Sequence, residues 1–234
     1  MQLNGKVVLI AGGSGALGQS VVPAFVRAGA QVMTADRHVP SAPIAGGAAM
    51  KADVADEADV QRLVNDVVRK AGRIDALINL VGGFAMGRLE ETDAALWQRM
   101  LTMNVTSAFL LSKAVTPHMV ARGTGRILHV AAWAAIEPFA GAAAYIVSKA
   151  SLLALIKVLA LELSGSGVTV NGVLPNTIDT PANRASMPRT DPSTWTKPES
   201  IADMLVFLAS EEARQISGAA VPIGVRVSAK SVGT

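Results

Sequence analysis

Short apolar runs alternate along this chain with longer stretches of helical periodicity, and this rhythm constrains the fold more than any other feature. The apolar runs are bounded by turn residues and are too short for helices, so they are predicted to be strands: Lys6–Ala11, Gln31–Ala35, Ala76–Leu80, Arg126–Ala131, Val168–Val173 and Ala219–Ile223. The stretches between them are predicted to be helices: Leu17–Ala28, Glu57–Ala71, Thr92–Ala121, Tyr145–Ser164 and Glu199–Ser210. Strands separated by helices predict an α/β fold, a doubly wound Rossmann-type parallel sheet of about seven strands with helices on both faces.

The composition does not break along the 234 residues, so we expect a single domain, residues 1–234, with a large core. One segment, residues 180–198, stands apart, because it holds four prolines among many small polar residues. An excursion of that length inside a compact domain is more typical of an active-site lid than of a linker.

Composition excludes several classes of function. There are no cysteines, which excludes disulfides, thiol catalysis and thiolate metal sites, and the three histidines lack metal-ligand spacing, so no metal is expected. The net charge of +3 is spread without a basic run, which argues against a nucleic-acid partner. The richest apolar stretch, Ala150–Leu163, is interrupted by Lys157 and Glu162, so no membrane helix is expected. With no signal peptide at the N-terminus, we expect a cytoplasmic protein that acts on a small molecule.

The only tyrosine, Tyr145, precedes Lys149 by four residues. On a helix this spacing puts both side chains on one face, one turn apart. A lysine held there favours the phenolate and brings the phenol proton within reach of transfer near neutral pH. His129, on a predicted strand, is expected to be a packed residue and not a catalyst.

A glycine-rich turn follows the first predicted strand. Gly13, Gly15 and Gly18 match G-x-G-x-x-G, which lets the backbone approach a pyrophosphate at a helix N-terminus. Asp36 ends the second predicted strand, where a carboxylate would accept the adenosine ribose hydroxyls and repel a 2′-phosphate. Arg37 beside it could partly accommodate that phosphate, so NAD(H) is preferred and NADP(H) stays an alternative.

Five motifs in order resemble the short-chain dehydrogenase/reductase family: the glycine loop, Asn79-Leu80-Val81-Gly82-Gly83, Asn104, the Tyr145/Lys149 pair and Pro175-Asn176-Thr177-Ile178-Asp179-Thr180. The resemblance implies that Tyr145 is the acid/base, that Lys149 lowers its pKa and binds the nicotinamide ribose, and that Asn104 holds a proton-relay water. It also implies pairing of the long helices Thr92–Ala121 and Tyr145–Ser164 in a homodimer or homotetramer.

The resemblance further implies a cofactor site in which Asp53 and Val54 contact adenine and Ile178 and Thr180 bind the carboxamide and phosphate side. The full predicted set is Gly12, Gly13, Ser14, Gly15, Ala16, Leu17, Gly18, Asp36, Arg37, Asp53, Val54, Val81, Gly82, Gly83, Tyr145, Lys149, Pro175, Thr177, Ile178 and Thr180.

Departures from the family pattern carry information about the substrate. The smaller ones are Ala11, Ala16, Leu80 and Asn176, and the largest is Ala131-Ala132, where Ser-Ser is expected. A serine hydroxyl there donates a hydrogen bond to the developing oxyanion of a carbonyl substrate, worth about 3 kcal/mol by analogy with other oxyanion donors. A methyl group cannot supply that hydrogen bond.

One branch of the family, dihydropteridine reductase, is similar in these same respects. The shared features are Gly12 to Gly18, Val81-Gly82-Gly83-Phe84, the alanine at the serine position, and Leu174 to Pro181 followed by Asn183-Arg184, Ser186-Met187-Pro188 and Ser193-Thr194-Trp195. Lids are where substrate specificity usually resides, so likeness in this segment is informative. Asn104 fits this branch less well than it fits the wider family.

The sequence therefore predicts NAD(P)H-dependent reduction of a quinonoid dihydropteridine-like or other delocalised acceptor, with Tyr145 as proton donor. Phe84, Trp133 and Trp195 are expected to offer apolar faces to the substrate, beside Ala132. One alternative is a carbonyl or alcohol dehydrogenase that acts without the usual serine. Another is a catalytically weak, cofactor-binding regulatory protein, against which the intact Tyr145, Lys149 and Asn104 argue.

Overall fold

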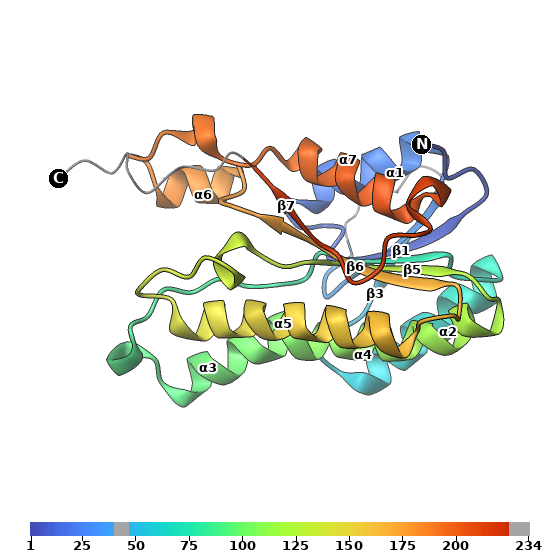
Figure 1. Cartoon of the computed structure of the whole chain (residues 1–234), viewed down its shortest axis with the longest axis horizontal. Helices are drawn as coiled ribbons and strands as arrows, with labels where there is room; N and C mark the ends of the chain where they lie inside the picture. Colours follow the sequence, from blue (N-terminus) through green and yellow to red (C-terminus); the bar gives the residue numbers. More distant parts are fainter. Residues whose placement is uncertain (40–46, 225–234) are drawn as a thin grey trace.

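The computed structural model describes residues 1–39 and 47–224, and in this part of the chain seven strands form one parallel sheet (Figure 1). The order of the strands across the sheet is β3-β2-β1-β4-β5-β6-β7. Their bounds are β1 Val7–Ala11, β2 Gln31–Asp36, β3 Ala48–Lys51, β4 Ala76–Asn79, β5 Gly125–Val130, β6 Val168–Pro175 and β7 Ala220–Ile223. The predicted doubly wound parallel sheet is confirmed. The short edge strand β3 was not among the predicted strands, because its Ala-Ala-Met-Lys sequence is only partly buried and has no β-branched residue.

Helices cover both faces of the sheet. The α-helices of the described residues are α1 Gly18–Arg27, α2 Glu57–Ala71, α3 Ala94–Leu101, α4 Ser107–Ala121, α5 Ala143–Glu162, α6 Pro181–Ser186 and α7 Pro198–Ala209. Figure 1 shows α1 and α7 on one face and α2, α4 and α5 on the other. Each face buries its own apolar cluster, as expected when a parallel sheet is covered on both sides.

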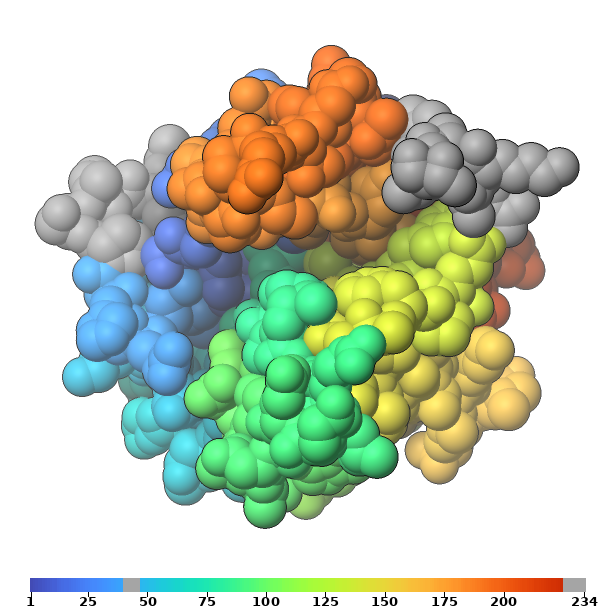
Figure 2. Space-filling model, turned by 90° about the vertical axis from the view of Figure 1, so that its left-hand side faces the viewer, coloured from blue at the N-terminus to red at the C-terminus, as the bar shows by residue number. Residues whose placement is uncertain are grey.

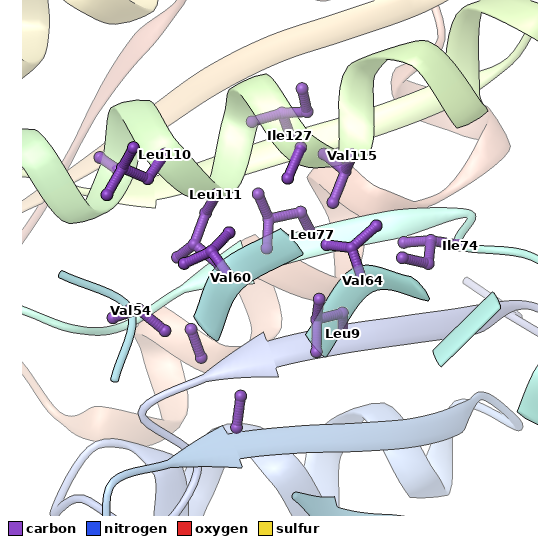
Figure 3. Close-up of a cluster of buried hydrophobic side chains, with 14 of the residues drawn as sticks. Leu9, Val54, Val60, Val64, Ile74, Leu77, Leu110, Leu111, Val115 and Ile127 are labelled. Carbon is purple, nitrogen blue, oxygen red and sulfur yellow. The ribbon is translucent and has the colours of Figure 1, made fainter. Parts of the chain in front are cut away.

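The cluster on the α2/α4/α5 face illustrates the packing. In Figure 3 Leu9, Leu77 and Ile127 project from three neighbouring strands, and side chains of α2 and α4 pack onto them. All three strand residues are completely buried. Burial of such side chains stabilises the fold by about 1.5–3 kcal/mol each, so this face holds β1, β4 and β5 in fixed register.

The predicted helix Thr92–Ala121 is not one regular α-helix. It begins at Ala94, because Asp93 caps it by accepting a hydrogen bond from the Leu96 N–H (2.7 Å). A π-helical turn, Thr102–Thr106, then separates α3 from α4. Such turns are rare inside α-helices and are frequent at functional sites. This one carries Asn104.

Helix α5 is the one helix in the described residues that is long and apolar enough, by length and composition, to cross a membrane. The core helix of a globular domain meets the same criterion. In this fold α5 packs on β6 and buries Leu152, Leu153 and Ile156 in the cluster on its face of the sheet. The tertiary structure therefore accounts for its apolar surface on that side.

Candidate active site

The carboxyl ends of the parallel strands bring the predicted motifs to one edge of the sheet. The glycine loop follows β1, Val81–Gly83 follows β4, Ala131 and Ala132 follow β5, and residues 176–180 follow β6. Ligands of open α/β sheets bind in the crevice outside these ends. Figure 2 looks onto this edge and shows a hollow between the predicted lid, in orange, and the loops after β4 and β5, in green and yellow.

Lys149 lies in the second turn of α5. Its ammonium Nζ donates a hydrogen bond to the carbonyl oxygen of Val130 at 2.8 Å, and the side chain is only 5% exposed. Burial lowers the pKa of Lys149 to about 8. The end of β5 thus positions the lysine.

Tyr145 lies one turn before Lys149 on the same helix, as predicted. Its ring packs edge-to-face against the ring of Phe84, with the two centroids 4.8 Å apart and an angle of 79° between the ring planes. Burial raises the pKa of Tyr145 to about 12. Desolvation of the phenolate is the cause of this shift, and the Lys149 ammonium is hydrogen-bonded to Val130. A phenol with this pKa keeps its proton at neutral pH and is suited to donate it. The expected lowering of the Tyr145 pKa by Lys149 stays a prediction.

Asn104 ties the loop after β4 to the catalytic helix. Its Oδ1 accepts from the Gly83 N–H (3.0 Å), and its Nδ2 donates to the Gly83 carbonyl (3.1 Å) and to Ser148 Oγ (2.9 Å). Ser148 in turn donates to the carbonyl of Tyr145 at 2.7 Å. The sequence placed Asn104 in the site but did not predict this clamp, the hydrogen bonds that join Asn104 to Gly83 and Ser148. The feature that could have indicated it is an amide side chain predicted in the same site as the adjacent glycines Gly82 and Gly83. Its predicted relay water stays a prediction.

Gly13 and Gly18 of the glycine loop lie too close to neighbouring atoms to carry a side chain. A Cβ on Gly13 would lie 2.5 Å from Thr34 Cγ2, and one on Gly18 would overlap the Gly13 carbonyl. Gly12 has a φ of +83°, which favours glycine. Ser14, Gly15 and Ala16 are exposed, and α1 begins at Gly18, so this loop lies at a helix N-terminus, a position that suits a phosphate. Leu17 is the residue before the helix.

Asp36 and Ser14 link the end of β2 to the glycine loop. The Asp36 carboxylate accepts from the Ser14 N–H (3.1 Å) and from its hydroxyl (2.6 Å). A carboxylate therefore stands beside the loop, where the resemblance expects the adenosine ribose. Arg37 follows it and is exposed.

The residues after β3 divide between solvent and core. Asp53 is exposed and accepts from the Ala55 N–H at 3.0 Å, whereas Val54 is 5% exposed and belongs to the buried cluster of that face. The side chain of Val54 is thus occupied in packing, and its backbone is the part that a ligand could reach.

The lid is an ordered segment anchored by Asn176, the residue that departs from the family's glycine. Asn176 Nδ2 donates to the Thr194 carbonyl (3.1 Å), and its Oδ1 accepts from the Thr196 N–H (3.0 Å). Residues 178 and 196 pair as an isolated bridge. Thr180 caps α6 by accepting from the Asn183 N–H at 3.2 Å, so its hydroxyl already has a structural role. Pro175 ends β6, and Thr177 and Ile178 are half-buried between that strand and the lid.

The predicted substrate residues differ in exposure. Phe84 is 58% exposed beside Tyr145, and Trp133 is half-buried in the turn that follows Ala132. Trp195, by contrast, is 8% exposed. Its expected role as an open apolar face is not met in this structure, because so little of the residue is exposed.

The residues at this edge fit a dinucleotide. Gly82 leaves a gap that a side chain would fill: a Cβ there would lie 2.8 Å from Asn104 Oδ1 and 3.1 Å from Lys149 Nζ. The strip Val81–Gly83 is thus a side-chain-poor floor between the glycine loop and the catalytic groups. Such a floor, with N–H groups at one end and a lysine at the other, suits a pyrophosphate and a ribose.

Comparison with known proteins agrees with this fold. A family model described as enoyl-(acyl carrier protein) reductase matches residues 12–224. A 3-oxoacyl-(acyl-carrier-protein) reductase of Thermotoga maritima is 30% identical and aligns over 95% of this chain and 98% of its own. A 2,5-dichloro-2,5-cyclohexadiene-1,4-diol dehydrogenase of Sphingobium indicum is 33% identical over 95% of this chain and 96% of its own. The crystal structure of a 3-ketoacyl-(acyl-carrier-protein) reductase from Brucella melitensis complexed with NADH superimposes with a TM-score of 0.84, at 28% identity, covering 95% of this chain and 98% of that one.

Proposed function

Because this chain belongs to the short-chain dehydrogenase/reductase family, whose members are NAD(P)-dependent oxidoreductases, we propose that it reduces a delocalised acceptor, such as a quinonoid dihydropteridine-like bicycle, with Tyr145 as proton donor. The observation that carries the proposal is Ala132. This alanine is 5% exposed at the carboxyl end of β5, where the family pattern has a serine hydroxyl.

The chain's own residues have distinct roles in such a reaction. The floor Val81–Gly83 and the glycine loop bind and orient the dinucleotide, which supplies the hydride when bound. Tyr145 holds its proton at neutral pH because burial raises its pKa to about 12, and it delivers that proton to the reduced acceptor. Lys149, fixed by the Val130 carbonyl, orients the ribose and adds positive charge next to the phenol.

The character of the acceptor follows from what Ala132 lacks. Reduction of a simple ketone places negative charge on one oxygen, which a hydroxyl donor stabilises by about 3 kcal/mol. Reduction of a conjugated C=N system spreads that charge over several ring atoms, so one aimed donor matters less. Phe84, next to Tyr145, and the half-buried Trp133 offer apolar surface of the kind that binds a flat ring.

The second candidate is an alcohol or ketone dehydrogenase that works without the serine. The relatives favour it, since one is named as a diol dehydrogenase and others as 3-oxoacyl or 3-ketoacyl reductases. In that case another donor must reach the substrate oxygen. Thr177, two residues after the end of β6, is the candidate donor that the sequence offers.

A steady-state assay separates these candidates. NADH and NADPH would each be tested with a quinonoid dihydropterin, a quinone, simple ketones and, in reverse, simple alcohols. We expect turnover of the delocalised acceptors well above that of the ketones. Efficient turnover of ketones with none of quinonoid acceptors would overturn the pterin-like assignment and support the dehydrogenase. Cofactor binding without turnover of anything would support a regulatory protein.

The cofactor preference proposed is NAD(H). Asp36 supports it, because its carboxylate stands beside the glycine loop and would meet the 2′-phosphate of NADP(H) as a like charge. The N–H and the hydroxyl of Ser14 already donate hydrogen bonds to that carboxylate, and the ribose hydroxyls would add to these bonds or replace them.

A homodimer or homotetramer is the proposed assembly. Apolar side chains are exposed along the outer surfaces of α4 and α5: Phe109 45%, Val120 43%, Val147 41%, Val158 48% and Leu161 77%. Exposed apolar side chains on these two helices support an interface between copies of this chain, since contiguous apolar patches mark interaction sites. Light scattering at micromolar concentration tests it: a monomer would refute the assembly, and Leu161→Lys should weaken a dimer without unfolding the chain.

A further inference from the structure

His129 is a completely buried histidine at the centre of the sheet that the proposed reaction does not use. It lies on β5, directly opposite Asn79 of β4 in the strand register. Both side chains project toward α4, where Ser112 packs over them. A buried imidazole needs partners for both ring nitrogens, and the structure supplies them.

The hydrogen bonds define one tautomer. Ser112 Oγ uses its single proton to donate to the Ala108 carbonyl at 2.7 Å, so it can only accept from His129 Nε2, 3.1 Å away. Nε2 therefore carries the ring proton, and Nδ1 is an acceptor. Asn79 Nδ2 faces this Nδ1 at 3.4 Å and donates to it. Asn79 Oδ1 then accepts from the Val81 N–H at 3.0 Å.

Electrostatics keep the ring in this state. Burial, together with the nearby Lys149 ammonium, lowers the pKa of His129 to about 3. The imidazole is thus neutral at physiological pH and retains the lone pair that accepts from Asn79. It transfers no proton there.

This chain of hydrogen bonds ends on the cofactor floor. The Val81 N–H is held from below by Asn79, and Gly83 is held by Asn104. The backbone around Val81 also touches the glycine loop, because a Cβ on Gly12 would lie 3.2 Å from Val81 N. A shift of Val81 would therefore disturb both the glycine loop and the gap over Lys149.

We propose that His129 is a positioning residue for the cofactor: by accepting a hydrogen bond from Asn79 it keeps the backbone of Val81–Gly83 in the position that the dinucleotide requires. The proposal rests on the proposed use of NAD(P)H. It assigns to this strand residue control over cofactor affinity through the chain His129, Asn79, Val81.

Two amide substitutions test the two ring nitrogens of His129 separately. His129→Asn places Oδ1 where Nδ1 was and keeps the acceptor for Asn79, whereas His129→Gln places its amide where Nε2 was and keeps only the partner of Ser112. Calorimetric titration with NADH should give a dissociation constant raised about tenfold in His129→Gln, as loss of one buried hydrogen bond predicts. His129→Asn should stay close to wild type.

Ile127→Val is the matched control for stability. Ile127 lies two residues earlier on β5 and belongs to the buried apolar cluster of that face, so this change destabilises the same strand without touching the hydrogen-bond chain. It should lower the melting temperature and leave the NADH dissociation constant unchanged. In steady state, His129→Gln should raise KM for NADH more than it lowers kcat at saturating cofactor.

The outcomes distinguish this inference from the proposed function. Equal loss of NADH affinity in His129→Asn and His129→Gln, or wild-type affinity in both, would overturn the positioning role while leaving the reaction intact. Additive effects of Asn79→Ala and His129→Gln in a double-mutant cycle would also contradict it, since both act through one chain. A wild-type protein that binds NADH yet reduces no delocalised acceptor would refute the substrate proposal alone. A wild-type protein that binds neither dinucleotide would overturn both.

Discussion

Tyr145 illustrates how burial influences whether a side chain donates or accepts a proton. Its position four residues before Lys149 follows from the sequence, but its pKa of about 12 follows from burial in the folded chain. At neutral pH such a phenol is a proton donor and a poor base.

Tyr145→Phe should lower turnover by about 10²–10⁴-fold, because the general acid is removed while the ring packing on Phe84 is kept. Steady-state kinetics together with NADH titration measures this. Cofactor affinity should be nearly unchanged, since the phenol is not the main binding group. Near wild-type turnover of every substrate by the variant would show that Tyr145 is not the proton donor.

Ala132→Ser should raise activity on simple ketones by about tenfold or more, because it restores an oxyanion donor. Reduction of a delocalised acceptor should change little or fall. Ala131→Ser is the matched control: the same atom is added one residue earlier, where the side chain belongs to the buried cluster facing α5. If both serines have the same effect, the added hydroxyl does not act on the substrate.

Asp36→Ala should narrow or reverse a preference for NADH, because the like charge beside the 2′-phosphate disappears and Arg37 is left to meet it. The ratio of KM values for NADPH and NADH measures the change. Asp36→Asn, which keeps the shape and removes the charge, should move the ratio in the same direction. A preference for NADPH in the unmutated protein would show that Arg37 outweighs Asp36.

At the scale of elements, the site depends on short segments that end strands. The strip Val81–Gly83 has little side chain of its own, and its position comes from neighbours on three other elements: Asn104 in the π-turn, Lys149 on α5 and the glycine loop. The π-turn turns Asn104 toward Gly83 between two otherwise regular helices. Small residues in the strip are therefore a requirement of packing.

Gly82→Ala should reduce kcat by about 10²-fold, since the new Cβ would press on Asn104 Oδ1 (2.8 Å) and Lys149 Nζ (3.1 Å) and displace both. Gly87→Ala is a matched control on the same loop, because its Cβ would meet Thr92 Oγ1 at 3.0 Å, away from the catalytic groups. It should retain most of the activity. Equal losses would mean that the loop responds to crowding anywhere.

At the scale of the whole molecule, the buried neutral imidazole of His129 makes the stability of the folded state sensitive to acid. His129 has a folded-state pKa of about 3 against an ordinary value of 6.5. Between these values the unfolded chain binds a proton that the folded chain does not. The stability associated with the neutral ring is therefore fully present above pH 6.5 and is lost as pH falls toward 3.

The free energy of unfolding of the wild type should thus fall on acidification, by about 1.4 kcal/mol per pH unit from this group alone. Urea unfolding at about pH 7 and about pH 4.5 measures it. His129→Asn should lose less stability between these values, because carboxylates are shared by both proteins and only the histidine differs. Equal losses in the two proteins would show that the buried ring does not govern the acid response.

Much of the architecture follows from local pattern. Apolar runs flanked by turn residues placed six of the strands within a residue or two, and the order of motifs placed the glycine loop, Asn104, Tyr145 and Lys149 at one edge of a parallel sheet. These are consequences of periodicity and spacing, which act over a few residues. The edge strand β3 escaped because it is short, half-exposed and poor in strand-forming residues.

The sequence by itself determined the alternation of strands and helices, the spacing of the Tyr145/Lys149 pair and the absence of a hydroxyl at Ala132. Only the tertiary structure decided the direction of the Tyr145 pKa, the clamp of Asn104 on Gly83, the burial of Trp195 and the hydrogen-bond chain from His129 to Val81. The physical reason is the separation along the sequence over which each effect acts. Periodicity and turns are properties of neighbouring residues, whereas desolvation and buried hydrogen bonds depend on groups that are tens of residues apart and meet only when the sheet has formed.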